Sequence, residues 1–368
     1  MISTTLARSS GADALIEVLP SAQGSLSLVD VTLRDAGGAC MRAQGPNLEV
    51  TVNGLLFDGC GDEAAWWRNL DVTATNLTVG AGAASGVSLA GVRGSVEGVD
   101  ASAHDGPGAS MHLEDIDEDL RLVDLTLVAG QGTAALTGGP NRALNLEGVH
   151  ISGAPGLDVD DSSGLLQNLV FDGPGTGTAF IAHHGRSSSL EVNGLNISGY
   201  ALGLDAHADS TEDPAPLRVQ HAVVQADVAL AADGHAVELH DAALTGSVQI
   251  ADATVKAVAG GLDLDQVTVL GDGVLERWIV QRFVAERAGT PSDGAWEVAP
   301  SLPDVVAQAA NGQGAAVDIA LLVGVIDANE AQITDEGTVR LDVPGSPPVE
   351  ATVTLGAGPV ILTVLSNQ

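Results

Sequence analysis

Aromatic residues are nearly missing from this chain. Phe, Trp and Tyr together make up 2% of its 368 residues, and tyrosine occurs once. A thick, irregular globular core depends on such large rings for much of its buried area, so a core of that kind is excluded. Ala, Val, Leu and Ile supply most of the apolar side chains instead. This composition favours a thin and repetitive interior.

Positively charged residues are also scarce. Lys and Arg number 14 against 48 Asp and Glu, Lys256 is the only lysine, and the formal net charge is −34. Nucleic acid needs a basic surface that contacts its phosphates, so no nucleic acid partner is expected, and an anionic membrane is disfavoured for the same reason. Cations and neutral or basic ligands remain. Strong acidity also keeps a surface solvated in salty water. Composition alone does not show whether the acidic surface binds cations or serves only to keep the protein solvated.

Long hydrophobic runs and cysteines are also scarce. No apolar run reaches the roughly 18 residues of a membrane span, and residues 1–20 lack the basic start and apolar block of a signal peptide. We expect the chain to be part of a longer multidomain protein. The only two cysteines are Cys40 and Cys60. They predict either a disulfide or two buried free thiols, and the sequence leaves both open.

A repeat runs from about residue 26 to residue 271. Its pattern is apolar-x-apolar-x-turn-apolar-x-apolar-x-Gly, with clear copies at Leu144–Gly153, Leu190–Gly199, Val237–Gly246 and Leu262–Gly271. The turn slot is mostly Asn, Asp or Gly, which tolerate a left-handed backbone. In register it holds Asp30, Gly54, Asn76, Gly98, Asp124, Gly148, Asn168, Gly194, His221, Asp241 and Gln266.

Each copy predicts two short alternating strands that meet at a sharp bend, because period-2 alternation places one side of a strand inward. A third alternating stretch follows, as in Met111–Leu113 and Leu157–Val159. Three strands per coil and a period of about 24 residues describe a parallel β-helix of about eleven coils. Leucine-rich repeats are the nearest rival, but they need a different return segment and an Asn ladder at another offset.

The predicted fold class is therefore all-β, with three parts. Residues 1–24 form an N-terminal cap or partial coil, residues 25–275 a right-handed parallel β-helix, and residues 276–368 a small β-sandwich. In the tail, strands are expected at 278–284, 296–298, 316–325, 337–343, 349–355 and 360–365, separated by turns such as Pro344–Ser346. That spacing is typical of a small sandwich.

Two family resemblances follow from these motifs. The turn and Gly slots of the solenoid resemble those of the pectin-lyase-like β-helix superfamily, which contains lyases, hydrolases, adhesins and inert stalks. The tail segments Ala288–Ala295 and Thr334–Val339 resemble carboxypeptidase-regulatory-like or Ig-like modules. Such modules act as spacers or adhesion units in secreted proteins. The pairing implies an extracellular or cell-surface location.

Acidic residues recur on the third strand and are the catalytic candidates. Glu114, Asp160 and Asp205 are expected on every second coil, roughly 10 Å apart, a spacing near that of an inverting glycoside hydrolase. Asp160–Asp161 followed one coil later by His184 also resembles the Asp pair and His of the pectin hydrolases. The family's further Asp and its Arg-x-Lys motif have no counterpart here. The alternative is a solvated acidic face.

Calcium is the cofactor that the same carboxylates would bind, since Ca²⁺ takes six to eight oxygen ligands. The densest acidic clusters supply the candidate ligands Glu114, Asp115, Asp117, Asp158, Asp160 and Asp161. Loosely held counterions are the alternative. His183, His184 and His207 form a weaker candidate set for a transition metal.

Trp66, Trp67 and Arg68 are the candidate ligand-binding residues. They are expected in a loop beside Asp62 and Glu63, where stacked tryptophans would suit sugar rings. The alternative is that one Trp packs against a neighbouring coil. Two N-glycosylation sequons begin at Asn76 and Asn196, and both Asn side chains are expected to point outward.

Three functions fit these features. The leading hypothesis is an extracellular structural or interaction protein, a rigid stalk or adhesin whose partners are carbohydrate or other surface proteins. The first alternative is a polysaccharide lyase or glycoside hydrolase that uses the acidic face. The second is a carbohydrate-binding module without catalysis.

Overall fold

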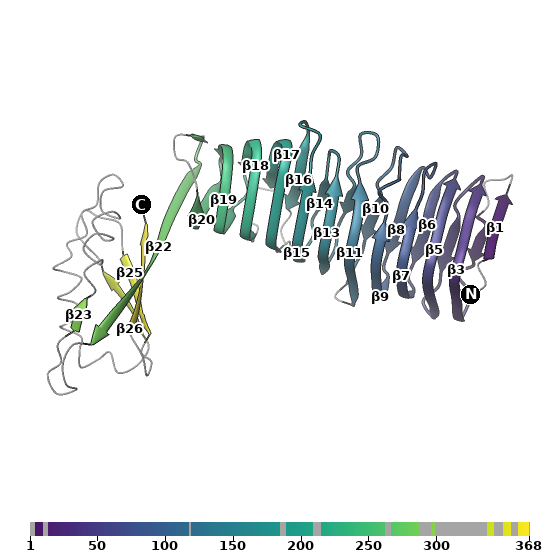
Figure 1. Cartoon of the computed structure of the whole chain (residues 1–368), viewed down its shortest axis with the longest axis horizontal. Coiled ribbons are helices and arrows are strands. Elements are labelled where there is room, and N and C mark those ends of the chain that lie inside the picture. The colour runs from purple at the N-terminus through teal and green to yellow at the C-terminus, as the bar shows by residue number, and fades with distance from the viewer. Residues whose placement is uncertain are drawn as a thin grey trace. The chain divides into compact units, whose positions relative to one another are not determined.

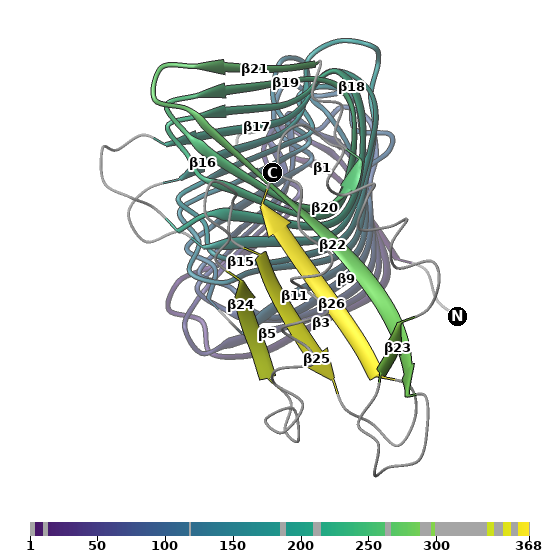
Figure 2. The same ribbon diagram turned by 90° about the vertical axis from the view of Figure 1, so that its left-hand side faces the viewer.

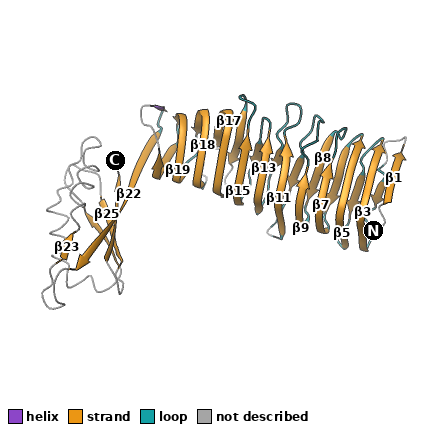
Figure 3. Ribbon diagram, in the orientation of Figure 1, coloured by secondary structure: helices purple, strands orange, loops and turns teal. Residues whose placement is uncertain are grey.

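A computed structural model gives the fold of the chain. It describes residues 4–9, 14–117, 119–184, 189–208, 215–261, 266–287, 296–298, 337–341, 349–354 and 360–367. Strands dominate these ranges, and no α-helix occurs in them (Figure 3). The chain divides into two compact units: residues 1–255 with 260–274, and residues 256–259 with 275–368.

The first unit is a parallel β-solenoid of about ten turns. Its first ladder contains β1 (Thr4–Ser9), β3 (Gly24–Ala36), β5 (Leu48–Cys60), β7 (Asp71–Val79), β9 (Arg93–Asp100), β11 (Leu120–Val128), β13 (Leu144–Ser152), β15 (Gly164–Asp172) and the first parts of β17 (Leu190–Ala208), β18 (Leu217–Asp233) and β19 (Val237–Ala251).

The second ladder runs alongside the first. It contains β2 (Ile16–Val18), β4 (Met41–Gln44), β6 (Glu63–Arg68), β8 (Ser85–Ala90), β10 (Met111–Glu114), β12 (Leu136–Gly138), β14 (Leu157–Asp160), β16 (Thr178–His184), the later parts of β17 to β19, and β21 (Val267–Leu270). The described pairings in both ladders are parallel; Leu146, for example, pairs with Leu122 and Leu166. The register shifts at Ser198–Tyr200 and at Gln225–Leu230, between the two parts of β17 and β18. Figures 1 and 2 show the strands of successive coils one behind another.

The predicted bend lies inside each first-ladder strand. Between Glu147 and Val149 the pairing skips Gly148, whose φ is +68°. Ten of the predicted turn residues, from Asp30 to Asp241, have positive φ, so the strand–bend–strand prediction is confirmed for these copies. The third strand is confirmed as well, because Met111–Leu113 and Leu157–Val159 lie in β10 and β14 of the second ladder.

From Asp30 to Gly194, the left-handed residues of this first corner alternate between Asx and glycine on successive coils. They are Asp30, Gly54, Asn76, Gly98, Asp124, Gly148, Asn168 and Gly194, then His221 and Asp241. A Cβ atom added to Gly148 would lie 2.7 Å from Oδ1 of Asp124. One added to Gly194 would lie 2.9 Å from Oδ1 of Asn168. Both distances are well inside van der Waals contact, so at these two positions the Asx side chain leaves no room for a Cβ on the next coil. Further along, His221 and Asp241 follow one another on successive coils, with their side chains 3.1 Å apart.

A second corner, which the sequence did not reveal, follows the second ladder. Its positive-φ residues are Gly45, Asn69, Gly91, Asp115, Gly139, Asp161, Gly234, Asp252 and Gly271. Here too a Cβ on Gly91 would lie 2.5 Å from Oδ1 of Asn69. From Asp30 to Asp161 the two corners are out of phase: a coil with Asx at the first corner has glycine at the second, as with Asn76 and Gly91, whereas the later coil of β19 has Asp241 and Asp252.

The last predicted copy, Leu262–Gly271, was assigned wrongly. Val267 to Leu270 pair with Val248 to Ala251 in the second ladder, whereas the repeat pattern placed them in the first. Gln266 is absent from the positive-φ residues accordingly. Because this segment alternates like the true copies, sequence alone counted it as an eleventh coil.

Small aliphatic side chains fill the interior, as the composition predicts. Val50, Val72, Val96, Leu122 and their counterparts on later coils are almost fully buried. The rings of Phe57, Trp67, Phe171 and Phe180 are inward as well, and Phe171 stacks on Phe180 with centroids 6.4 Å apart. Each coil thus buries a thin layer that only its neighbours complete.

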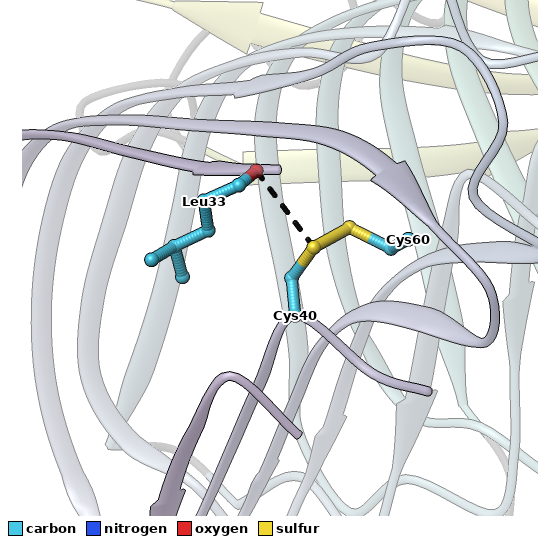
Figure 4. Close-up of a disulfide and its surroundings, with 3 residues drawn as sticks. All are labelled: Leu33, Cys40 and Cys60. Carbon is cyan, nitrogen blue, oxygen red and sulfur yellow. Dashed lines mark hydrogen bonds between the residues drawn. A yellow bond between two sulfur atoms is a disulfide. The ribbon is translucent and has the colours of Figure 1, made fainter. Parts of the chain in front are cut away.

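A disulfide joins Cys40 to Cys60. Cys40 precedes β4 on one coil and Cys60 ends β5 on the next, and both are fully buried. The Cys40 sulfur lies 3.8 Å from the carbonyl oxygen of Leu33, and Figure 4 marks this contact with a dashed line beside the disulfide. Of the two alternatives left open by the sequence, the cross-link between neighbouring coils is the one found.

The second unit contains an antiparallel sheet. β26 (Val360–Asn367) pairs with both β25 (Val349–Thr354) and β22 (Val274–Arg287); β24 (Gly337–Leu341) and β23 (Trp296–Val298) complete the sheet on either side. The strand expected at 316–325 and both tail segments that carry the module resemblance, apart from Gly337–Val339, lie outside the described residues. In the described ranges no helix is long and apolar enough to cross a membrane.

Candidate functional site

The outward face of the second ladder carries the predicted catalytic and metal-binding residues. Register places its outward side chains in two columns that run along the solenoid. The first column includes Arg42, Trp66, Ser88, His112, Thr137, Asp158, Ile181 and Asp205. The second includes Gln44, Arg68, Ala90, Glu114, and further along Asp160, His183, His207 and Asp233.

Two imidazoles and their carboxylates cluster on β14, β16 and β17. The rings of His183 and His207 stack with centroids 5.6 Å apart. Nε2 of His207 lies 2.6 Å from Oδ1 of Asp205, and Nε2 of His183 lies 3.8 Å from Oδ1 of Asp158. Asp160 is exposed on the coil before His183. The structure therefore brings four of these groups into contact on a surface open to water.

The register differs from the predicted catalytic row in one respect. Glu114 and Asp160 share a column two coils apart, but Asp205 aligns with Asp158 in the other column, because His183 and His207 continue the column of Asp160. β16 ends at His184, whose side chain lies outside the described part of the chain. Catalysis by these residues remains a prediction.

The predicted calcium ligands lie in different local environments. Glu114 accepts a hydrogen bond from Arg68 at 3.1 Å, and Asp117 lies 3.9 Å from Arg142. Asp115 and Asp161 hold left-handed positions at the second corner, with φ of +53° and +43°. Within the described ranges no three His, Cys, Asp or Glu side chains are grouped closely enough to hold a metal ion.

The Trp66–Arg68 segment is a strand, and its predicted loop was wrong. It forms the end of β6, where Ala65 and Trp67 point inward and Trp66 and Arg68 outward. Trp67 is fully buried and cannot meet a ligand, so the alternative in which one Trp packs among the coils holds for it. The short alternating run beside Asp62 and Glu63 is the signal that could have identified the strand.

Trp66 and Arg68 form the centre of a small surface platform. The guanidinium carbon of Arg68 lies over the Trp66 ring, 5.1 Å from its centroid, a cation–π contact. Arg68 then reaches across the small side chain of Ala90 to Glu114, two coils away. On the coil before Trp66, Arg42 binds Asp62 at 2.7 Å. We call the surface made by Trp66, Arg68, Ser88, Ala90 and Glu114 the Trp66 platform.

Both sequon asparagines are exposed, as expected. Asn76 occupies a left-handed corner position with φ of +55°, and its amide donates to Oδ1 of Asn53 at 3.3 Å. Asn196 lies within β17, in register between Val170 and Val223. Glycosylation of either remains a prediction.

A polar cluster that the sequence did not indicate surrounds Asp172. Its carboxylate contacts His150 at 2.8 Å and accepts a hydrogen bond from Ser198 at 3.1 Å. These two contacts, the His150 contact foremost, hold the pKa of Asp172 below its ordinary value. Nearby, Tyr200 donates to the carbonyl of Gly153 at 2.6 Å. Burial, with a smaller contribution from Asp172, raises the pKa of Tyr200 to about 12.

Comparisons with protein-family models, with curated proteins and with solved structures found no match for this chain. The parallel β-solenoid is therefore known from the coordinates and the repeat alone. The pectin-lyase-like and Ig-like resemblances have no independent support.

Proposed function

We propose that the protein is an extracellular or cell-surface structural and interaction protein built on a rigid solenoid. The single observation that carries this proposal is the buried Cys40–Cys60 disulfide between neighbouring coils. Structural disulfides persist mainly in oxidising compartments. A cross-link fully inside a solenoid also has no access to substrate, which fits reinforcement of the coil stack.

The ladder contacts support the same role. Neighbouring coils are joined by continuous parallel pairing and by ion pairs such as Arg121–Glu147 at 2.6 Å and Arg218–Glu238 at 3.0 Å. A stack in which every strand but the terminal ones pairs on both sides resists bending, as a spacer must. Membership of the pectin-lyase-like superfamily and an Ig-like second unit belong to this proposal, supported by the turn slots and by the antiparallel strands of the tail.

The rival is a polysaccharide lyase or hydrolase. The specific observation in its favour is the cluster of Asp158, Asp160, His183, Asp205 and His207, which offers carboxylates and imidazoles on one open face. A screen against acidic and neutral polysaccharides tests it. Turnover that Asp160→Asn abolishes would overturn the purely structural role.

Localisation is the direct test of the proposal. Antibodies against the native protein should label intact cells of the source organism, or the protein should accumulate in the medium. Both cysteines should be unreactive toward maleimide until a reductant is added. Lysine-directed surface labels are unsuitable because Lys256 is the only lysine. Labelling that requires permeabilised cells, with reactive Cys40 and Cys60, would contradict the proposal.

A further inference from the structure

A depression of about 540 Å³ lies at the second corner. Asn69, Gly91 and Val92 line it where the corners are shortest, since β6 and β8 are each followed by only two residues before the next strand begins. Longer corners stand on either side. Pro46 belongs to the corner before, while Asp117 and Arg142 belong to those after β10 and β12. The hollow thus results from unequal corner lengths.

One wall of this depression is fixed from within by Asn141, which is 2% exposed. Its Oδ1 accepts a hydrogen bond from the backbone of Ile116 at 3.0 Å, and its Nδ2 donates to Ser162 at 3.1 Å. The backbone N–H of Arg142 also donates to the carbonyl of Ile116 at 2.9 Å. The loops that carry Asp117 and Arg142 are therefore tied together beneath the surface, and such preorganisation lowers the cost of binding.

The Trp66 platform adjoins the depression along the chain, although none of its five residues lines the depression. Arg68 precedes Asn69, Ala90 precedes Gly91, and Glu114 precedes Asp115 on three successive coils. An exposed part of an indole therefore lies on the same coils as a polar hollow. Ser88 and Ala90 lie next to Trp66 and Arg68 in register, and their side chains are too small to separate the indole of Trp66 from the depression.

The charges around this surface nearly balance, unlike those of the chain as a whole. At the depression Arg142 stands against Asp117, Arg93 is paired with Asp71 at 2.9 Å, and Asp115 adds one negative charge. On the platform Arg68 is paired with Glu114. A net anion or cation gains little from such a surface. Arginine and asparagine donors, carboxylate acceptors and one flat aromatic ring together match a ligand that has many hydroxyl groups and weakly polar ring faces.

We propose that the Trp66 platform and the adjoining depression bind a neutral oligosaccharide. One sugar ring would stack on the part of Trp66 that Arg68 leaves exposed. The next residues of the saccharide would place their hydroxyl groups against Asp117 and Arg142. This binding activity goes beyond the proposed structural role, and its absence would leave the localisation test unaffected.

Calorimetric titration of the full chain with cellohexaose, xylohexaose, mannohexaose and hexagalacturonate tests the proposal. At least one of the three neutral hexasaccharides should bind. Trp66→Ala and Asp117→Asn should each weaken that binding by about tenfold or more, while Trp66→Phe should retain most of it. Arg121→Ala, which removes an exposed ion pair on the first ladder, is the matched control and should bind normally.

Three results would overturn the proposal. They are no binding of any neutral hexasaccharide at millimolar concentration, binding that Trp66→Ala and Asp117→Asn both leave unchanged, and binding confined to hexagalacturonate. Melting midpoints measured for each variant separate lost binding from lost folding, and Asp117→Asn at an exposed corner keeps the test open if Trp66→Ala is unstable.

Discussion

The residues with left-handed backbone set the path of every coil. An Asx residue tolerates positive φ better than other non-glycine residues, and its side chain then leans onto the next coil. Asn168 shows this with Gly194, and Asp124 with Gly148. Steric contact between coils, added to local backbone preference, therefore decides which residue type each corner can hold.

A double-mutant cycle at Gly194 and Asn168 separates these two effects. Gly194→Ala should destabilise the solenoid by about 1–2 kcal/mol through backbone strain and further through the contact with Oδ1 of Asn168. In an Asn168→Gly background only the strain should remain, so the effect of Gly194→Ala should shrink. Urea unfolding of the four proteins measures the coupling. If Gly194→Ala lowers stability equally in both backgrounds, the side chain of Asn168 does not contact residue 194 on the next coil.

The only tyrosine offers a second test at the residue scale. Tyr200 has a pKa raised to about 12 in the folded protein, against about 10 in an unfolded chain. The folded state therefore retains the proton longer, so stability should be unaffected below pH 10 and should fall as pH rises from 10 toward 12. Tyrosinate absorbance at 295 nm should titrate near 12 in native protein and near 10 in denaturant. A native midpoint near 10 would contradict the buried environment.

Strand length explains what could be predicted at the scale of elements. First-ladder strands such as Leu144–Ser152 carry two alternating runs around a turn residue, enough pattern to fix their position. Second-ladder strands such as Leu136–Gly138 span as few as three residues, so their pattern is weaker. β6 has six residues, but the adjacent tryptophans Trp66 and Trp67 hide its alternation, and the sequence alone predicts a loop there.

The candidate site was harder to predict than the fold for a related reason. Arg68 and Glu114 are 46 residues apart, and they meet only because the two turns of chain that separate them have particular loop lengths. Fold depends on the average period, whereas a contact between side chains depends on the length of each individual coil. The sequence thus predicted the residue types of the acidic face correctly and misplaced Asp205 within it.

The disulfide is testable as a link between elements. Cys40 and Cys60 close a loop with a sequence separation of 20, and removing a cross-link of that size costs about 3 kcal/mol. The double variant Cys40→Ala, Cys60→Ala should lose about that much stability in urea unfolding. Wild-type protein measured in reductant should approach the variant. Identical midpoints for oxidised wild type and the variant would show that the bond does not hold these coils together.

Charge acts on the molecule as a whole. With a net charge of −34, the compact state suffers more self-repulsion than the unfolded chain. Monovalent salt screens exposed charges, with a Debye length of about 10 Å at 0.1 M. Melting midpoints should therefore rise as NaCl is added from low millimolar concentrations. A midpoint that does not move would leave solubility as the purpose of the acidic surface.

Calcium is tested by the same melting series at matched ionic strength. A native-state site raises stability in proportion to the logarithm of ligand concentration over its dissociation constant. If calcium binds on the second ladder as predicted from the sequence, CaCl₂ should stabilise more than NaCl, and Asp158→Asn with Asp160→Asn should remove the difference. Coinciding NaCl and CaCl₂ curves would contradict a specific site.

Because coils with Asx alternate with coils with glycine at the first corner from Asp30 to Gly194, removing one coil and removing two have different effects on packing. Removing the single coil that contains Gly148 would place Asp124 directly before Asn168, two side chains where the stack has room for one. Removing two adjacent coils would keep both corners in phase. Since one rung rises about 4.8 Å, the part of the solenoid from Asp30 to Gly194 can lengthen or shorten without this clash only in steps of about 10 Å. The length of that part therefore changes by pairs of coils.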